Sequence, residues 1–300
     1  MIRGAIRRKS GRRLWSNTVA ATGWGESTFA EQAWDKSRGA AARWGVAGVL
    51  VGVLVGVVAF APATWLASAV ASATQQRLLL ADARGTVWSG SAVPILTGGQ
   101  DSHDASALPS RLEWTIGPNG LGFEVRARQA CCLNGTVALQ LRPGLGRVTV
   151  KLLPPAGWVG QWPSAWLGGL GTPFNTLQLG GAVRLASPAG ITLESVQGRW
   201  RMEGRADVEL VAASSRLSTL DTLGSYRLTL TGDPASAGAP QLTLSTLEGA
   251  LQLSGTGNWG TGGVRFRGEA KASSGDETAL SNLLNIIGRR DGARSVISIG

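Results

Sequence analysis

The residue types that catalysis needs are scarce in this chain, and only one histidine is present. His103 lies in the polar segment TGGQDSHDAS, between Ser102 and Asp104. These three residue types form nucleophilic triads, but sequence neighbours rarely supply the geometry in which a base lies between a nucleophile and an orienting carboxylate. The segment is typical of an exposed loop. We therefore expect no catalytic role for His103, and an unchanged phenotype of His103→Ala would remove an esterase-like alternative.

Metal-binding motifs are also missing from the sequence. Asp101, His103 and Asp104 would make a weak metal site, since structural zinc sites usually draw on several histidines or cysteines. The two cysteines, Cys131 and Cys132, are adjacent and lack metal-ligand spacing. Because neighbouring residues of a regular strand point to opposite faces, a bridge between them would need a distorted turn. We expect one buried thiol and one thiol that is exposed or paired with another molecule.

The acidic residues beyond residue 77 are few and mostly alternate with apolar residues, as solvated residues of a sheet do. Examples are Glu113, Glu124, Glu194, Glu203 and Asp207. A phosphate-binding loop is not expected, because no Gly-Lys-Ser/Thr follows a glycine run. The sequence predicts that the protein is not an enzyme and has no catalytic residue, no cofactor and no metal site.

A stretch without any charge, Trp44 to Gln76, precedes the rest of the chain. Within it, Gly45 to Trp65 supplies the roughly 20 apolar residues that a membrane-spanning helix needs. We predict a single transmembrane anchor at residues 44–66. A cleaved signal peptide is the competing interpretation, because Ala71-Ser72-Ala73 resembles a cleavage site. Its apolar region would be only about 7–15 residues behind a short basic lead, so the anchor is favoured.

Positive charge is concentrated before this stretch. The chain has a net charge of +10, and residues 1–43 hold nine Lys or Arg against three acidic residues. A basic flank before an apolar span marks the cytoplasmic side. We expect residues 1–43 to be a poorly ordered cytoplasmic arm and residues 77–300 to form a periplasmic domain. The cluster IRRKSGRR at residues 6–13 could bind nucleic acid, but a topology signal near anionic headgroups is the simpler interpretation.

Three glycines divide the apolar stretch at intervals of four residues. Gly48, Gly52 and Gly56 fall on one face of a helix, and small residues at this spacing let two helices approach closely. This stripe is a candidate site for packing against another membrane helix. The alternative is a lone anchor that faces lipid on all sides.

The pattern changes after residue 77 to short segments in which every second residue is apolar. Clear cases are 112–116, 137–141, 148–152, 177–179, 183–185, 191–193, 228–230, 242–244, 251–253 and 264–266. Period two predicts strands with one buried and one solvated face, and the intervening glycines suit hairpin turns. We predict a mainly β protein, in which the anchor is followed by an elongated, curved antiparallel sheet with one or two short covering helices.

Two segments break this alternation. Trp158, Trp162 and Trp166 are spaced four apart, which predicts a short helix kinked at Pro163, either as a lid packed on the sheet or as a docking surface. Residues 276–290 have apolar side chains at helical spacing and predict an amphipathic helix. A last strand is expected at residues 295–299.

Two segments of the sequence resemble those of a known protein family. The segment GTVWSGSA, with Gly85, Thr86, Trp88, Gly90 and Ala92, resembles the G-T-[VL]-W-x-G-x-A segment that follows the anchor in type II secretion system protein N (general secretion pathway protein N). The ending LLNIIGRRDGARSVISI is similar to the tail of many members. The resemblance covers roughly residues 45–300, whereas residues 1–43 form a longer lead than the family pattern has.

This resemblance implies an inner-membrane accessory subunit of the machine that exports folded periplasmic proteins across the outer membrane. It implies contacts with other inner-membrane subunits or with the outer-membrane secretin, and it carries over no catalytic residue. A second hypothesis is an anchored periplasmic protein that binds or transfers lipid in a curved, apolar sheet groove. An open Leu/Val face would favour lipid binding, whereas a face closed by residues 158–166 would oppose it. The sequence leaves the direct partner and the oligomeric state open.

Overall fold

The computed structural model describes residues 43–300 except residues 173, 197–198, 234–239 and 261–262, so the expected cytoplasmic arm lies almost entirely outside the described residues. The chain divides into two compact units, Met1–Val58 and Ala59–Gly300. The first unit contributes helical residues at 43–58, and the second contains the sheet.

The helix in the apolar stretch ends at residue 59, before the end of the predicted span from Gly45 to Trp65. It is described over residues 43–59 and is followed, after Pro62, by a separate helix, α2 (Ala63–Ala73). A residue that precedes proline is pushed toward extended backbone, and proline has no N–H to donate to the preceding turn. No helix formed by the described residues combines the length and the apolar character that crossing a membrane requires.

Helix α2 belongs to the sheet-containing unit. Ala63 is 1% exposed and packs in a cluster with Ala92 and Trp114, against which Leu66 is partly buried. The end of the charge-free stretch therefore contributes to the core of the β unit.

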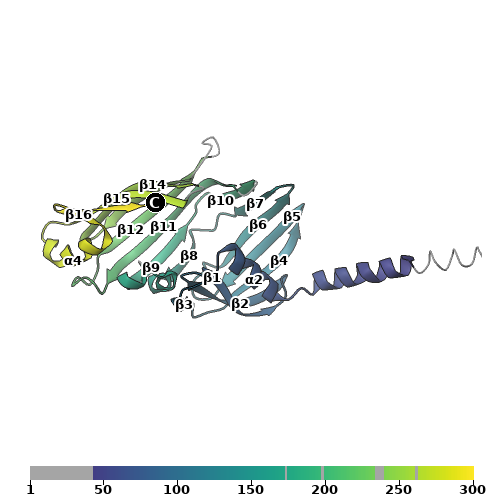
Figure 1. Ribbon diagram of the computed structural model, residues 1–300. Coiled ribbons are helices and arrows are strands. Elements are labelled where there is room, and N and C mark those ends of the chain that lie inside the picture. The colour runs from purple at the N-terminus through teal and green to yellow at the C-terminus, as the bar shows by residue number, and fades with distance from the viewer. Residues whose placement is uncertain (1–42, 173, 197–198, 234–239, 261–262) are drawn as a thin grey trace, which may run out of the picture. The chain divides into compact units, whose positions relative to one another are not determined.

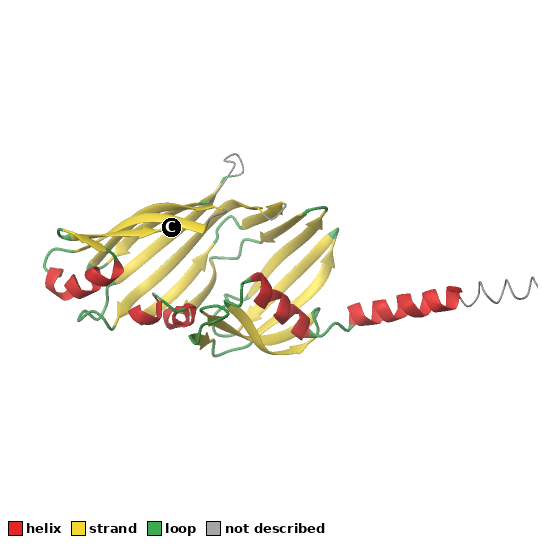
Figure 2. Ribbon diagram, in the orientation of Figure 1, coloured by secondary structure: helices red, strands yellow, loops and turns green. Residues whose placement is uncertain are grey.

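The described residues form seventeen strands in one antiparallel sheet, which confirms the predicted mainly β, antiparallel fold (Figures 1 and 2). The strands are β1 (Leu78–Gly85), β2 (Ser89–Thr97), β3 (Ala105–Ala107), β4 (Leu112–Asn119), β5 (Gly122–Gln129), β6 (Thr136–Gly144), β7 (Arg147–Leu152), β8 (Trp158–Pro163), β9 (Leu179–Ala186), β10 (Ile191–Val196), β11 (Arg199–Ser215), β12 (Gly224–Gly232), β13 (Gln241–Glu248), β14 (Leu251–Gly260), β15 (Gly263–Ala272), β16 (Arg289–Asp291) and β17 (Arg294–Ile299). Most neighbours in the sheet are also neighbours in the chain, as expected for hairpins.

The sheet branches at β11, its longest strand. One edge of β11 pairs with β12, whereas the other edge pairs first with β10 and then, over residues 207–215, with β9. Strand β10 continues through β7 to β6, β5 and β4, and β9 continues to β8. Two branches therefore leave the same strand edge.

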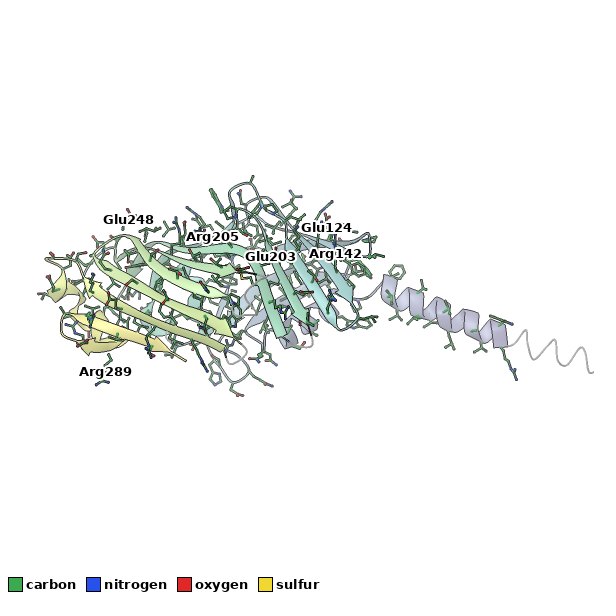
Figure 3. All side chains as sticks on the ribbon, turned by 90° about the horizontal axis from the view of Figure 1, so that it is seen from above. Glu124, Arg142, Glu203, Arg205, Glu248 and Arg289 are labelled. Atoms are coloured by element: carbon green, nitrogen blue, oxygen red, sulfur yellow. A yellow bond between two sulfur atoms is a disulfide. The ribbon has the colours of Figure 1, made fainter. Side chains whose placement is uncertain are left out.

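The register divides apolar from polar residues across the whole sheet, because directly paired residues share a face. One apolar row runs through Ile116, Val125, Leu139, Leu152 and Ile191, and a second through Leu185, Val208, Leu228 and Leu244. The opposite face carries the charged residues, including Glu124, Arg142, Glu203 and Arg205, which are labelled in Figure 3. The predicted two-faced strands are thus present.

Short helical segments cover the apolar face only in places, and in Figure 2 they lie at one end of the strands. The predicted amphipathic helix is confirmed as α4 (Glu277–Ile287), and the predicted last strand as β17. Leu280, Leu283 and Leu284 of α4 are at most 2% exposed and belong to the largest core cluster of the described residues. Tyr226 lies in the same cluster and donates a hydrogen bond from its hydroxyl to the Leu251 carbonyl at 3.0 Å.

Candidate docking surface

The His103 loop does not assemble a triad. His103 is exposed, the backbone N–H of Asp104 donates to Ser102 Oγ at 3.1 Å, and Asp104 Oδ2 accepts from Asn175 Nδ2 at 3.0 Å. The serine and the aspartate therefore stabilise the loop rather than orient the histidine. Within the described part of the chain, no three His, Cys, Asp or Glu residues are grouped so that they could hold a metal ion.

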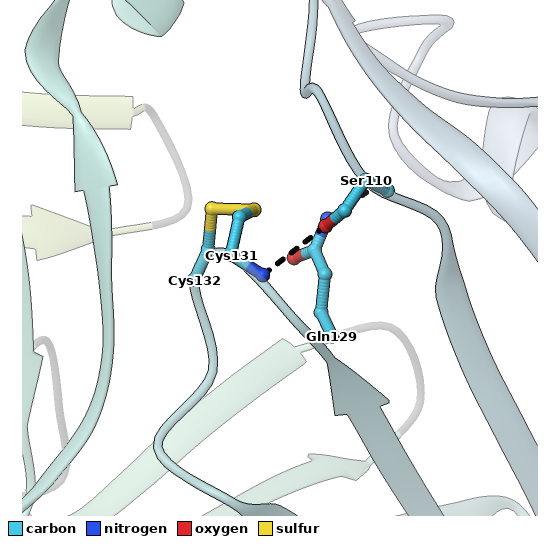
Figure 4. The surroundings of a disulfide bond; sticks show 4 residues. All are labelled: Ser110, Gln129, Cys131 and Cys132. Carbon is cyan, nitrogen blue, oxygen red and sulfur yellow. Dashed lines mark hydrogen bonds between the residues drawn. A yellow bond between two sulfur atoms is a disulfide. The ribbon is translucent and has the colours of Figure 1, made fainter.

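The expectation of two separate thiols is wrong, because Cys131 and Cys132 form a disulfide with each other (Figure 4). Strand β5 ends at Gln129 and β6 begins at Thr136, so the cysteines lie in the connecting turn rather than in a strand. Their side chains are not forced to opposite faces there. Ser110 holds this turn from the β3–β4 loop, because its hydroxyl accepts from the Cys131 N–H at 3.3 Å.

The family-like motif forms the corner between β1 and β2. Gly85 adopts φ +88°, a left-handed conformation that favours glycine. Thr86 closes the turn, since its N–H donates to the Ser89 carbonyl at 2.8 Å. Gly90 leaves room for a neighbour, because an added Cβ would lie 2.7 Å from a ring carbon of Trp114. The motif residues thus have conformational and packing roles.

The same corner receives the chain that arrives from residue 61. The Val87 N–H donates to the Ala61 carbonyl at 2.8 Å, and the Val87 carbonyl accepts from Trp114 Nε1 at 3.0 Å. The Trp88 ring lies 5.9 Å from the Phe123 ring, and Ala92 is completely buried. The corner therefore holds the first residues of the second unit against the sheet.

The prediction of a kinked helix bearing three tryptophans on one face is wrong. Residues 158–163 form strand β8, and residues 164–170 form a 3₁₀ helix, η1 (Ser164–Leu170). A bulge between Trp158 and Gly160 reverses the alternation, so Trp158 lies on the charged face, 5.1 Å from the Arg184 guanidinium. Trp162 lies on the apolar face and stacks on Trp166 at 6.4 Å.

Part of the apolar face has no covering element among the described residues. Val148 of β7 and Leu193 of β10 lie on this face and are 39% and 38% exposed. Trp259, Val264 and Ile299, at adjacent ends of β14, β15 and β17, are 53%, 40% and 54% exposed. The alternating pattern predicted which face is apolar, but it carried no signal of where helices would leave that face open.

The charged face is built from ion pairs. Arg227 donates to Glu209 at 2.7 Å, and Arg205 pairs with Asp207 at 3.0 Å. Burial favours the neutral form of Asp207, but hydrogen bonds from Thr229 and Arg205 outweigh it and lower the pKa of this carboxyl. The Arg227–Glu209 pair links neighbouring strands β12 and β11, whereas Arg205 and Asp207 both lie in β11.

The glycine stripe of the N-terminal helix remains open. A Cβ added to Gly48, Gly52 or Gly56 would meet no atom within 4 Å. The described structure therefore leaves space along this stripe for a second helix.

Comparison with protein families finds a match. The family model described as "Type II secretion system (T2SS), protein N" matches residues 76–297. Neither the curated proteins nor the solved structures contain a match to the chain.

Proposed function

Because the chain belongs to the type II secretion system protein N family, we propose that it is an inner-membrane accessory or scaffold subunit of this system. The family match over residues 76–297 is the observation that carries the proposal. In this role the protein supports export of folded proteins from the periplasm across the outer membrane. It does so by contacting other inner-membrane subunits or the secretin, and the exposed apolar ends of β14, β15 and β17 support such a binding role.

The anchor of this subunit is the charge-free stretch at residues 44–66. Side chains of the helix at 43–59 are exposed, as for Val49 at 66% and Leu50 at 64%, which suits contact with lipid. The basic residues before it keep the N-terminus in the cytoplasm and direct residues 77–300 to the periplasm. Alkaline phosphatase fused after Gly300 should be active in cells, and an inactive fusion at normal abundance would contradict this topology.

Deletion of the gene tests the secretion role. Folded exoproteins should accumulate in the periplasm of the deleted strain, and expression of the full chain should restore their release. Unchanged release from the deleted strain would contradict a required scaffold role.

In-cell crosslinking tests the contact surface. A photo-reactive side chain at Ile299 or Trp162, both on the apolar face, should capture other secretion subunits. Ser298 is the matched control, because it precedes Ile299 in β17 and points to the opposite face. Equal capture from Ile299 and Ser298 would argue against a contact through the apolar face.

Lipid binding is a second candidate function, and the exposed part of the apolar face favours it. Residues 158–163 are a strand of the sheet and Trp158 lies on its other face, so only Trp162 and the stacked Trp166 remain from this segment to cover the apolar face. An acyl chain could cover Val148 and Leu193 without needing hydrogen-bond partners. Lipid that co-purifies with the full-length protein in excess over a single-pass control protein, measured by mass spectrometry, would support this candidate. Equal lipid content in both preparations would oppose it.

A further inference from the structure

The turn that carries the disulfide also joins the two branches of the sheet. Leu133, just after the cysteines, forms an isolated antiparallel bridge with Gly160 of β8. The Gln161 N–H donates to the Cys132 carbonyl at 2.7 Å. Strand β8 lies at the end of one branch, and the turn connects β5 to β6 in the other branch. These contacts close a ring of strands that begins and ends at β11.

Asn134 strengthens the same junction. Its N–H donates to the Val159 carbonyl at 3.0 Å, and its side-chain Nδ2 donates to the Ala156 and Trp158 carbonyls at 3.1 Å each. Val159 is 4% exposed and packs in a core cluster with Val137 of β6. The junction therefore links the backbone of β8 to a core that both branches share.

The junction depends on the position of one peptide group. A Cβ added to Gly160 would lie 2.6 Å from the Cys132 carbonyl oxygen, so the two backbones approach as closely as glycine allows. A small rotation of the peptide after Cys132 would move its carbonyl away from the Gln161 N–H. The position of the Cys132 Cα, from which this carbonyl extends, thus contributes directly to the junction.

The disulfide is well placed to fix that backbone. A bridge between adjacent residues closes no long loop, so it removes little entropy from the unfolded chain. Its effect is local, because the small ring it forms restricts the dihedral angles on both sides of the Cys131–Cys132 peptide. Cys131 is exposed, whereas Cys132 is only 5% exposed. A reductant can therefore reach the bridge from the side of Cys131.

We propose that the Cys131–Cys132 bridge is a thiol–disulfide exchange site whose redox state sets whether the two branches stay joined. The co-reactant is a dithiol. One of its thiolates attacks Cys131 Sγ, the S–S bond breaks, and Cys132 leaves as a thiolate that takes up a proton. The second thiol of the reductant attacks the mixed disulfide and releases Cys131. Two electrons and two protons pass to the protein, and the dithiol becomes a disulfide.

Hydrogen exchange on the full-length protein in detergent tests this assignment. Dithiothreitol without denaturant should release two thiols and add 2 Da to the mass. Exchange of the Gln161 and Asn134 amides should then accelerate by roughly tenfold, as expected when about one hydrogen bond is lost. The Leu251 amide, which donates to the Leu223 carbonyl at 3.0 Å beside the α4 cluster, should keep its exchange rate.

A double variant, Cys131→Ser with Cys132→Ser, separates the bridge from the reagent. It should exchange like the reduced wild-type protein and should not respond to dithiothreitol. Three results would overturn the proposal: thiols released only after denaturation, unchanged Gln161 and Asn134 exchange after full reduction, or faster exchange at Leu251 as well. If the double variant does not fold, reduced and alkylated wild-type protein provides the same comparison.

Discussion

At the residue scale, the family-like motif acts through the space that its glycines leave. A Cβ on Gly90 would lie 2.6 Å from the Arg84 carbonyl oxygen and 2.7 Å from the Trp114 ring. We expect Gly90→Ala to lower the free energy of unfolding by about 1–3 kcal/mol, since overpacked sites must shift backbone or rings. Urea unfolding followed by tryptophan fluorescence measures this change. Gly117→Ala is the control, because nothing lies within 4 Å of its added Cβ, and it should be neutral or slightly stabilising. Equal effects of the two variants would contradict the packing role.

Asp207, also a single residue, makes a pH-dependent contribution to the free energy of unfolding. Its folded pKa lies below the ordinary value of 3.8, because the hydrogen bonds from Thr229 and Arg205 outweigh burial. A lowered carboxyl pKa stabilises the fold above the unfolded pKa, and that stability is lost as pH falls through the folded pKa. Asp207→Asn should therefore cost about 1–2 kcal/mol at neutral pH and progressively less below about pH 4. Urea unfolding at several pH values measures the difference. A loss that is constant with pH would contradict the ionic explanation.

At the scale of elements, α4 closes the largest core cluster of the sheet. Leu284 is 1% exposed among Leu280, Leu283 and Tyr226, so Leu284→Ala should lower the free energy of unfolding by about 2–5 kcal/mol. Ile286 lies on the outer side of the same helix and is 48% exposed. Ile286→Ala should change stability by less than about 0.5 kcal/mol. Thermal or urea unfolding of both variants tests which side of the helix faces the core. A larger loss of stability for Ile286→Ala than for Leu284→Ala would contradict this orientation.

The N-terminal helix carries the second prediction for an element. If Gly48, Gly52 and Gly56 face another membrane helix, Gly52→Leu should reduce capture of secretion subunits by a crosslinker placed at Gly48 by at least about fivefold, because a larger side chain separates the helices. Val57→Leu lies on another side of the helix and should leave capture unchanged. Immunoblots of crosslinked membranes measure the yield. Equal capture by Gly52→Leu and the wild-type protein would mean that the stripe faces lipid.

The sequence correctly predicted those elements whose formation depends on the local spacing of apolar residues. Period two located strands such as 112–116 and 148–152, and helical spacing located α4. Helical spacing misled at residues 158–166. The strand there is stabilised by pairing with β9, which is distant in the sequence, and the bulge after Trp158 leaves no sign in the spacing of the tryptophans. The disulfide was missed for the same reason. Its formation depends on the turn between β5 and β6, whereas the argument from Cys131 and Cys132 assumed a regular strand.

At the scale of the whole molecule, one region of the apolar face is covered by α4 and another region is exposed. The part under α4 cannot accept a charge, but Leu193 lies on the same face at 38% exposure. Leu193→Asp should therefore cost less than about 1 kcal/mol of stability, in line with other exposed sites, yet it should lower exoprotein release several-fold if this face binds a secretion subunit. Thr192→Asp places the same charge on the opposite face of β10 and should leave release unchanged. Unfolding curves and release assays on the same strains decide the matter. Normal release with Leu193→Asp at normal abundance would move the binding surface away from this part of the face.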